Sequence, residues 1–357
     1  MKSITVLVTG AGSPGFPGVV QSLRFVSEYD IRIIATDMNE EATGRFFADS
    51  FFLVPQASSQ LFIEELLIIC ERERVDVLLP MVSAELPILA NHQEDFARVG
   101  TKVSVSNSEC ITQVQNKGIL YHMVRHAGLI VPNYTVVRTV QELEKAIGEM
   151  GYPQKAVCFK PIISDGSRGF RILDPSINRM KLLFFEKPNS TYISYSELFT
   201  ILDKLPNIPE LLVMEYLPGE EYSVDILADR GSVIVAIPRL RVATVNGITS
   251  RGALVREDDV IDYVSTIVHR FGLHGNIGVQ VRRDDAKIPK LIEVNPRIQG
   301  TIVLCTAGGV NLPFLAVKLA MGIPIESIEY QVQWGMRMNR YWKEVFFDIQ
   351  GVQHPLS

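Results

Sequence analysis

Three oxygen-bearing side chains recur at a spacing that suits a metal-bound phosphate. Glu293 and Asn295 stand two residues apart in the run 291–297, so they point to the same face if this run is a strand. A hairpin partner that contains Gln280 can bring a third oxygen ligand beside them. Mg²⁺ takes oxygen ligands and usually only one or two carboxylates, with phosphate oxygens and water in the other positions. The set therefore predicts a site for a magnesium–nucleotide complex.

Three arginines are candidates for contact with a transferring phosphoryl group. Arg297 continues the alternation of Glu293 and Asn295, so its charge would offset the charge that develops on the phosphoryl group. The apolar residues on either side argue against a mere polar strand end in solvent. Arg239 and Arg241 alternate on another strand and share a face. For this second pair, a solvated strand face stays open as the alternative.

A lysine and a glycine-rich loop follow one another in the middle of the chain. Lys160 ends the apolar run 156–159, and the loop 164–169 comes directly after it. Backbone N–H groups of such a loop can cover phosphates while the ammonium neutralises their charge. The candidate residues of the loop are Ser164, Gly166, Ser167 and Gly169. The chain has no G-x-x-x-x-G-K-[ST] motif, so this is not a P-loop.

The segment 215–221 lies between two expected strands. Its extended backbone could pair with an adenine edge while Glu221 reaches ribose hydroxyls. As an isolated string it is more often just an acidic turn. Its interpretation depends on the elements on either side of it.

A second glycine loop opens the chain. Residues 10–15 fit G-x-G-x-x-G after an expected strand, and Asp37 ends the next strand, which is the context of a dinucleotide fingerprint. An NAD(P)-dependent oxidoreductase is therefore an alternative. Pro14 and Pro17 stiffen the loop, and many α/β domains use such a turn only to pack the first helix or to hold a substrate carboxylate.

The elements that must position these residues begin with β-α-β units. We expect strands at 4–9, 31–36, 75–79 and 102–105, a first helix ending near Tyr29, and helices at 60–72 and 85–100. This alternation predicts a parallel sheet. Glu85 and Pro80 fall at its carboxyl edge, where open α/β sheets hold ligands. A helix-cap role for Glu85 is the alternative.

The remaining chain predicts mixed helices and antiparallel strands. We expect a helix at 108–128 capped by Ser106 or Ser108, a helix at 141–150 and one at 195–204, strands at 134–137, 156–159 and 170–173, several strands within 210–241, a helix at 260–271, a hairpin of 277–282 with 290–294, and a helix at 312–321. The uncharged run 300–317 contains glycine, asparagine and proline. We interpret it as a buried loop plus helix rather than a membrane span.

Length and composition limit the classes of protein. The chain has 357 residues with 47% hydrophobic and 21% charged, which predicts two or three globular domains. A net charge of −5 gives no global reason to bind nucleic acid or anionic lipid. The four cysteines are too scattered for a disulfide framework or zinc site. We interpret His122 and His126 as helix surface. The first residues show no signal peptide, so we expect a cytoplasmic protein.

Taken in order, these pieces resemble the ATP-grasp superfamily of carboxylate–amine ligases, and most closely one synthetase unit of the carbamoyl-phosphate synthetase large chain. The resemblance runs to about Met321 and is most specific at Gln280, at Glu293-x-Asn295-Pro296-Arg297 and at 307–313. It implies an α/β and α+β fold: a Rossmann-like (pre-ATP-grasp) parallel sheet at 1–106, linker helices and a lid lobe at 107–213, a lobe with the metal site at 214–330, and a C-terminal extension at 331–357.

The resemblance also implies roles for individual residues. Gln280 and Glu293 would hold one Mg²⁺, Glu293 and Asn295 a second, and Mn²⁺ can substitute in such sites. The transferring phosphoryl group would be contacted by Arg297, with Arg239 and Arg241 close to it. ATP would be held by Lys117, Lys160, the loop 164–169, a hinge of Glu215, Tyr216 and Leu217, and Glu221 at the ribose. Gly12, Ser13, Glu85, Gly300 and Thr301 would line the substrate side.

The implied activity is ATP-dependent phosphorylation of a carboxylate to an acyl phosphate, followed by coupling to an amine. Carbamoyl-phosphate synthetase carries two units and typically has arginine where this chain has Lys117 and Lys160, which favours a single-unit ligase. Phosphorylation of bicarbonate or carbamate stays as an alternative, as do the oxidoreductase and a nucleotide-binding regulator without catalysis. The expected partners are small-molecule carboxylates and amines, with no nucleic acid and no membrane. A homodimer is left open.

Overall fold

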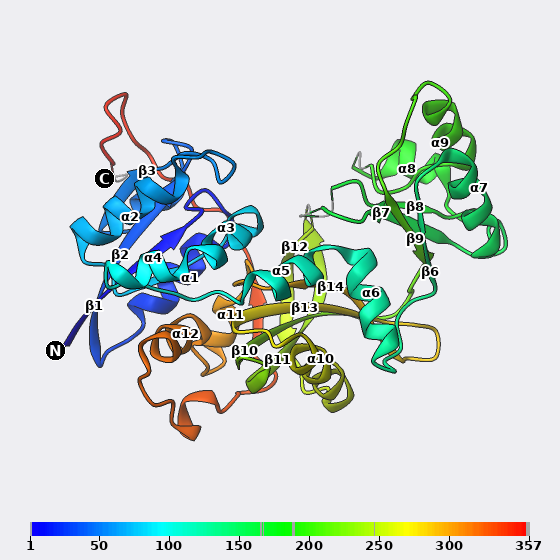
Figure 1. The fold of residues 1–357 in the computed structure, drawn as a ribbon. Coiled ribbons are helices and arrows are strands. Elements are labelled where there is room, and N and C mark those ends of the chain that lie inside the picture. The colour runs from blue at the N-terminus through cyan, green and yellow to red at the C-terminus, as the bar shows by residue number, and fades with distance from the viewer. Residues whose placement is uncertain (1, 165, 167, 188–189, 246, 355–357) are drawn as a thin grey trace. The chain divides into compact units, whose positions relative to one another are not determined.

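The computed structural model describes residues 2–354 apart from 165, 167, 188–189 and 246. It falls into two compact units, shown in Figure 1 and described separately below. Unit 1 comprises Met1–Val114, Glu221–Val281 and Ile292–Ser357, and unit 2 comprises Gln115–Glu220 and Arg282–Leu291. The chain therefore leaves unit 1 twice, at Gln115 and at Arg282, and returns to it at Glu221 and at Ile292.

Unit 1 begins with a five-stranded parallel sheet of order β3-β2-β1-β4-β5. Its strands are β1 (Lys2–Thr9), β2 (Tyr29–Asp37), β3 (Ser50–Leu53), β4 (Val77–Leu79) and β5 (Lys102–Val103). Apolar residues on successive positions are buried on opposite faces, as parallel sheets require. Val6 and Val8 join the cluster that contains helix α1 (Phe16–Arg24), whereas Leu7 joins the cluster that contains α2 (Phe62–Glu73). The predicted parallel sheet is confirmed.

Three details of this sheet differ from the sequence prediction. Helix α1 ends at Arg24 instead of near Tyr29, because Tyr29 already pairs with Lys2 in the sheet. The four-residue strand β3 was not predicted; it is too short to show a pattern. The expected helix 85–100 is divided into η2 (Ser83–Glu85), α3 (Leu86–Asn91) and α4 (Gln93–Arg98), since His92 leaves the helical region at φ −111° and ψ 15°.

The second sheet has six strands in the order β14-β13-β10-β11-β12-β15. Its strands are β10 (Glu221–Asp229), β11 (Ser232–Val245), β12 (Ile248–Leu254), β13 (Gly275–Arg283), β14 (Pro289–Asn295) and β15 (Arg337–Asn339). Helices α10 (Asp258–Phe271), α11 (Val303–Ala307) and α12 (Leu312–Met321) accompany it. The residues of α12 share one core cluster with β1, β2 and α1, so this helix helps to join the two sheets of unit 1. The predicted hairpin of β13 and β14 is confirmed.

Unit 2 contains a four-stranded sheet of order β6-β9-β7-β8. Its elements are α6 (Lys117–His126), β6 (Tyr134–Val137), α7 (Val140–Glu149), β7 (Val157–Pro161), β8 (Arg171–Leu173), α8 (Arg179–Phe185), α9 (Tyr195–Leu202) and β9 (Leu211–Glu215). Strands β7 and β9 share one core cluster with α7 and α9. Helix α8 was not predicted, and it contributes no buried residue.

The expected helix 108–128 is two helices with caps other than those predicted. Helix α5 (Ser108–Gln115) begins after Asn107, whose side chain accepts the N–H of Cys110 at 2.8 Å. Asn116 caps α6 in the same way through the N–H of Ile119. The hydroxyl of Ser106 is instead bonded to the backbone of residue 274. Asparagine is suited to these caps because its side-chain oxygen accepts a hydrogen bond from a backbone N–H group in the first turn of the helix.

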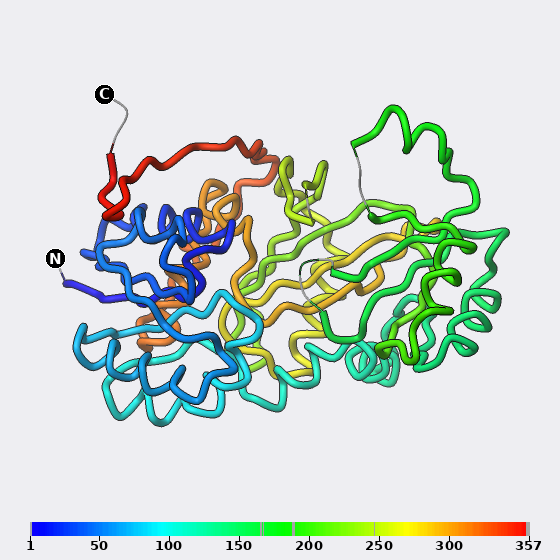
Figure 2. Tube along the Cα trace, turned by 90° about the horizontal axis from the view of Figure 1, so that it is seen from above, coloured from blue at the N-terminus to red at the C-terminus, as the bar shows by residue number. Residues whose placement is uncertain are grey.

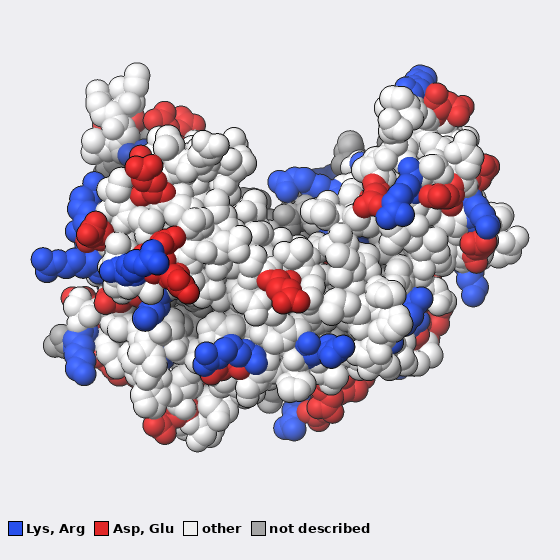
Figure 3. All heavy atoms as spheres, in the orientation of Figure 1, with Lys and Arg blue, Asp and Glu red and all other residues white. Residues whose placement is uncertain are grey.

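The run 300–317 contains the predicted loop and most of the predicted helix, α12, and in addition the short helix α11, which was not predicted. Among the residues that the structure describes, no helix is long and apolar enough to cross a membrane. The four cysteines are free and buried. The last described residues return to the N-terminal sheet (Figure 2), where Phe347 stacks on Phe46 with ring centroids 5.0 Å apart. On the face drawn in Figure 3, Lys and Arg side chains are interspersed with Asp and Glu.

Candidate functional site

The end of strand β14 places the predicted metal and phosphate residues in contact. The amide nitrogen of Asn295 donates to Glu293 Oε1 at 2.8 Å. The guanidinium of Arg297 in turn donates to Asn295 Oδ1 at 3.4 Å. All three side chains are half-buried. The two-residue alternation therefore puts a carboxylate, an amide and a guanidinium side by side at one strand end.

Gln280 lies on strand β13 of the same sheet, and its side chain contacts Arg241 of β11. One guanidinium nitrogen of Arg241 donates to Glu221 Oε1 at 2.5 Å and to Gln280 Oε1 at 3.2 Å. The Arg241 side chain is 7% exposed, and its Nε is buried without a hydrogen-bond partner among the described residues. Arg241 thus contacts both Glu221, which is predicted to bind the ribose, and Gln280, which is predicted to bind the metal.

The donor set fits a magnesium ion better than a transition metal. Glu293 offers a carboxylate, while Gln280 and Asn295 offer amide oxygens, which are ligands that hard cations prefer. Within the described ranges no cluster of three or more His, Cys, Asp or Glu side chains could hold a metal ion. The oxygen set has only one acid, so phosphate oxygens and water would have to complete the coordination.

Arg239 lies on the same strand as Arg241 but is 1% exposed. It makes a two-pronged ion pair with Asp225 on β10, with Nε near Oδ2 and Nη2 3.2 Å from Oδ1. Burial by itself would lower the pKa of Arg239, but the charge of Asp225 raises it above the usual value. Its remaining arm donates to Thr301 Oγ1 at 2.5 Å. The structure thus shows Arg239 holding other protein groups, whereas we expected contact with the phosphoryl group.

The loop that follows Arg297 is fixed by several elements of unit 1. Thr301 is held by Arg239, and Gln299 donates to the carbonyl oxygen of Val224 at 3.1 Å. Arg340 donates to the carbonyl oxygen of Gly300. Burial, and then the nearby charge of Arg239, lower the pKa of Arg340. The segment expected to face the substrate is therefore rigidly held.

The N-terminal glycine loop packs against this same segment. A Cβ atom added to Gly15 would lie 2.5 Å from the Cα atom of Gly300, so only glycine permits this approach of the two backbones. Asp37 accepts the N–H of Gly12 at 2.7 Å and the N–H of Asn39 at 2.9 Å. The acid and the N–H that a dinucleotide would need are thus bonded to each other. This geometry favours the packing role of the loop over a dinucleotide site.

Glu85 is a buried carboxyl group at the edge of the parallel sheet. It is 7% exposed, and the hydroxyl of Thr9 donates to it. Burial raises its pKa to about 7, against the lowering effect of the Thr9 hydrogen bond and with a smaller raising effect from Asp37. In the same short helix, Ser83 accepts a hydrogen bond of 3.1 Å from Arg297 Nε. Glu85 therefore belongs to the same region as the β14 strand end and can hold a proton near neutral pH.

The phosphate-binding candidates of unit 2 also lie together. Lys117 and Lys160 are 4% and 6% exposed, which is unusual for lysine. Lys117 Nζ donates to the carbonyl oxygen of Ser164 at 2.8 Å, at the start of the glycine loop. Lys160 Nζ lies 5.8 Å from the ring centroid of Tyr121.

The glycine loop itself is described only in part. Gly166 and Gly169 have φ angles of 61° and 75°, and a Cβ atom at Gly169 would clash with Pro161. Gly169 therefore requires glycine, whereas the positive φ of Gly166 favours it. Ser167 lies outside the described residues.

The predicted hinge follows strand β9. The carboxylate of Glu215 accepts the N–H of Asn133 at 2.9 Å and the ammonium of Lys290 at 2.8 Å. Leu217 is 3% exposed, and the hydroxyl of Tyr216 accepts a hydrogen bond of 3.4 Å from Arg282. The side chain of Glu215 thus has two partners within the protein, and its backbone N–H donates to the carbonyl oxygen of Asn133 at 3.0 Å.

Sequence reasoning missed four residues that support the candidate site. They are Ser83, Asp225, Lys290 and Arg340. Asp225 carries a local signal, because it alternates with Glu221 along β10 and therefore shares its face. The other three have no such signal, since each meets its partner through a contact between segments far apart in the chain.

Two family profiles match the chain. One is described as ATP-grasp in the biosynthetic pathway with Ter operon and matches residues 207–343. The other is described as the PylC-like N-terminal domain and matches residues 6–104. The first contains the β14 strand end and Arg340, and the second contains the glycine loop and Glu85.

Curated relatives include carbamoyl phosphate synthase large chains. The protein from Pseudothermotoga lettingae is 24% identical over 329 residues, which cover 88% of this chain and 26% of the relative. The protein from Clavibacter michiganensis subsp. michiganensis is 25% identical over 339 residues, with 86% and 28% covered. The chain thus spans about a quarter of the length of these relatives.

Solved structures of similar fold include two ligand complexes. An ADP complex of N5-carboxyaminoimidazole ribonucleotide synthetase aligns with a TM-score of 0.67 at 17% identity, covering 93% of this chain and 79% of that one. A biotin carboxylase complex from Campylobacter jejuni with β,γ-ATP aligns with a TM-score of 0.65 at 16% identity, covering 93% and 73%. At this identity the likeness establishes the fold, and the predicted fold class is confirmed. The chain thus contains an ATP-grasp domain at residues 207–343 and a PylC-like N-terminal domain at residues 6–104, and it is similar to one synthetase unit of the carbamoyl phosphate synthase large chain.

Proposed function

We propose that the protein is an ATP-dependent ligase that phosphorylates a small-molecule carboxylate and couples the acyl phosphate to an amine, releasing ADP and phosphate. The observation that carries the proposal is the contact of Glu293, Asn295 and Arg297 at the end of β14. A carboxylate and two amides suit a magnesium–nucleotide complex, and a guanidinium beside them suits a transferring phosphoryl group. Members of the superfamily use ATP with Mg²⁺.

Under this proposal, each candidate residue has its own role toward the nucleotide. Lys117 and Lys160 neutralise phosphate charge, and the loop 164–169 covers the phosphates with its N–H groups. The backbone of residues 215–217 contacts the adenine, and Glu221 contacts the ribose. Two Mg²⁺ ions held by Gln280, Glu293 and Asn295 would supply charge neutralisation at the phosphates; Mn²⁺ is an expected substitute.

The chemistry requires no nucleophilic side chain. A carboxylate oxygen of the substrate attacks the γ-phosphorus, and ADP leaves. The amine nitrogen then attacks the acyl carbon, the C–O bond to phosphate breaks, and inorganic phosphate leaves as the amide forms. Positioning and charge neutralisation supply most of the rate of such phosphoryl transfer. Arg297 is the catalytic candidate at the phosphoryl group, and Arg241 contributes a further charge.

The substrate side is assigned to unit 1. Gly12, Ser13, Gly300 and Thr301 would line it, and the buried carboxyl of Glu85 would receive the amine and take its proton. Arg239 acts as a positioning residue, because it reaches Thr301 rather than open space. Arg340 lies in the proposed extension 331–357, so that extension supports the site. The proposed boundaries of the other segments are 1–106, 107–213 and 214–330.

The second candidate is phosphorylation of bicarbonate or carbamate. The similarity to carbamoyl phosphate synthase large chains favours it. Lysine at positions 117 and 160 is the reason to rank it below the amide-forming ligase. A homodimer and a cytoplasmic location remain predictions.

The proposal is tested by a screen for phosphate and ADP release with Mg-ATP and mixtures of carboxylates and amines. We expect ADP formation that requires both one carboxylate and one amine. Turnover with bicarbonate alone supports the second candidate. Absence of ADP formation across a broad panel, together with a melting temperature raised by NAD(P) but not by Mg-ATP, would contradict both.

A further inference from the structure

Helix α8 of unit 2 presents an apolar surface that the protein leaves uncovered. Its α8 patch consists of Met180, Leu183, Phe184 and Phe185, which are 63%, 73%, 70% and 77% exposed. Met180, Leu183 and Phe184 stand at i, i+3 and i+4, so they form one stripe along the helix. Contiguous apolar patches of this kind usually mark an interaction surface.

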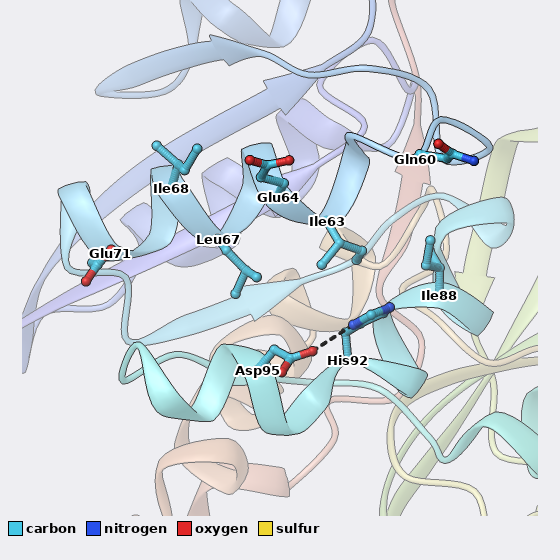
Figure 4. A pocket seen from close by; sticks show the side chains of 9 residues that line it. All are labelled: Gln60, Ile63, Glu64, Leu67, Ile68, Glu71, Ile88, His92 and Asp95. Atoms are coloured by element: carbon cyan, nitrogen blue, oxygen red, sulfur yellow. Dashed lines mark hydrogen bonds and ion pairs between the residues drawn. The ribbon is translucent and has the colours of Figure 1, made fainter.

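A groove of matching chemistry lies in unit 1 between α2 and the α3–α4 region. Its volume is about 480 Å³, and four apolar side chains line it together with the polar side chains of Gln60, Glu64, Glu71, His92 and Asp95 (Figure 4). Ile63 and Leu67 of α2 point toward Ile88 and His92 on the opposite wall. We refer to it as the α2 groove.

Acidic residues bracket the apolar part of the α2 groove. Glu64 and Glu71 are seven residues apart on α2, which is roughly 10 Å at 1.5 Å per residue. Leu67 and Ile68 lie between them on the same helix. Both carboxylates are exposed, and neither forms an ion pair with another residue that the structure describes. An occupant should therefore carry positive charge at both ends of an apolar stripe.

The α8 patch has this pattern. Arg179 and Lys181 stand at one end of it, and Lys187 follows the other end. Arg179 pairs with Glu197 and Lys181 with Glu186, each at 3.4 Å and on the surface. Such exposed pairs contribute at most about 1 kcal/mol, so they can be exchanged for other acids. The seven residues of α8 span roughly 10 Å, which matches the distance between the groove acids.

We propose that α8 of one molecule docks in the α2 groove of a second copy of the chain. The opposite charges and the matching lengths of the two surfaces are the reason to name another copy of the chain as the occupant. An amphipathic helix in an apolar groove is a recurrent mode of recognition. The contact is heterologous, because the two copies contribute different surfaces. A two-turn helix buries little area, so the association is weak and depends on protein concentration.

Charge reversal tests this pairing in the full chain. One variant is Glu64→Lys with Glu71→Lys, and the other is Lys181→Glu with Lys187→Glu. All four positions are exposed, so the fold should be retained. In sedimentation velocity over a wide concentration series, we expect each variant alone to self-associate about tenfold more weakly than wild type. An equimolar mixture of the two should restore association, because each intact or reversed surface then meets its complement.

Matched controls carry the same charge changes elsewhere. Glu28→Lys with Glu40→Lys, and Lys145→Glu with Lys155→Glu, also replace exposed residues and should associate as wild type does. Three results overturn the proposal. They are a wild-type protein that stays monomeric at every concentration, variants that associate as strongly as wild type, and a mixture that associates no better than its components.

Discussion

Asp225 and Arg239 form an ion pair in which both side chains are 1% exposed, and Arg239 connects this pair to Thr301 in the loop after the β14 strand end. The pair thus lies beneath the candidate site rather than in it. A buried charge pair is costly to break from one side, because the remaining charge keeps its desolvation penalty. The stability of unit 1 and the position of the loop that contains Thr301 therefore depend on the same ion pair.

Removing one charge of this pair should destabilise the protein strongly. For Asp225→Asn we expect a loss of about 3–5 kcal/mol in the free energy of unfolding, measured by denaturant titration. Asp225→Asn combined with Arg239→Gln removes both charges and should cost less than the single change. A double variant at least as unstable as the sum of the two single variants would contradict the ion pair's role.

The buried carboxyl of Glu85 should make stability depend on pH. Its pKa is raised from 4.5 to about 7 in the folded protein, so the folded state binds more protons than the unfolded state between these values. Stability from this group is fully present below about pH 4.5 and is lost as pH rises through about 7. Glu85→Gln should remove this dependence, an effect of about 3 kcal/mol across the window. The measurement is the unfolding free energy of both proteins as a function of pH, and parallel curves would refute the assignment.

The contact of Gly15 with Gly300 should not tolerate a methyl group. Gly15→Ala would place Cβ 2.5 Å from a backbone atom, so one of the two loops must move. We expect a loss of about 1–3 kcal/mol in unfolding free energy. Gly148→Ala is the matched control, since its Cβ would meet nothing within 4 Å on helix α7. That change should stabilise the protein by up to about 1 kcal/mol. Equal effects of the two substitutions would contradict the packing role of Gly15.

Lys117 should contribute to nucleotide affinity. For Lys117→Met we expect the dissociation constant for Mg-ATP to rise by about tenfold or more, as loss of one charge-assisted contact implies. Isothermal titration calorimetry measures it. Lys155→Met replaces an exposed lysine and serves as control. An unchanged affinity in the Lys117 variant would remove this residue from the proposed phosphate site.

The part of the site that sequence reasoning could predict is the part governed by local periodicity. Glu293, Asn295 and Arg297 lie within five residues, and the two-residue repeat of a strand suffices to bring them together. The parallel sheet was predictable for a similar reason, since buried strands read as continuous apolar runs.

The part that could not be predicted depends on pairing between distant segments. Arg340 meets Gly300 only because β15 pairs with β12, and three residues of β15 show no pattern of their own. Asp225 meets Arg239 across two antiparallel strands whose register is set by the turn between them. Helix α8 was not predicted because its seven residues are too few for their apolar spacing to distinguish a helix from an irregular segment.

The most direct test of the proposed function is ADP formation by Glu293→Ala with the carboxylate and amine that the screen identifies. Glu149→Ala, an exposed acid on α7, is the control. The account predicts that Glu293→Ala keeps the melting temperature of wild type and loses at least about a hundredfold in kcat/KM, which corresponds to roughly 2.7 kcal/mol of transition-state stabilisation. Turnover equal to wild type in the Glu293→Ala variant would contradict the metal assignment and the mechanism built on it.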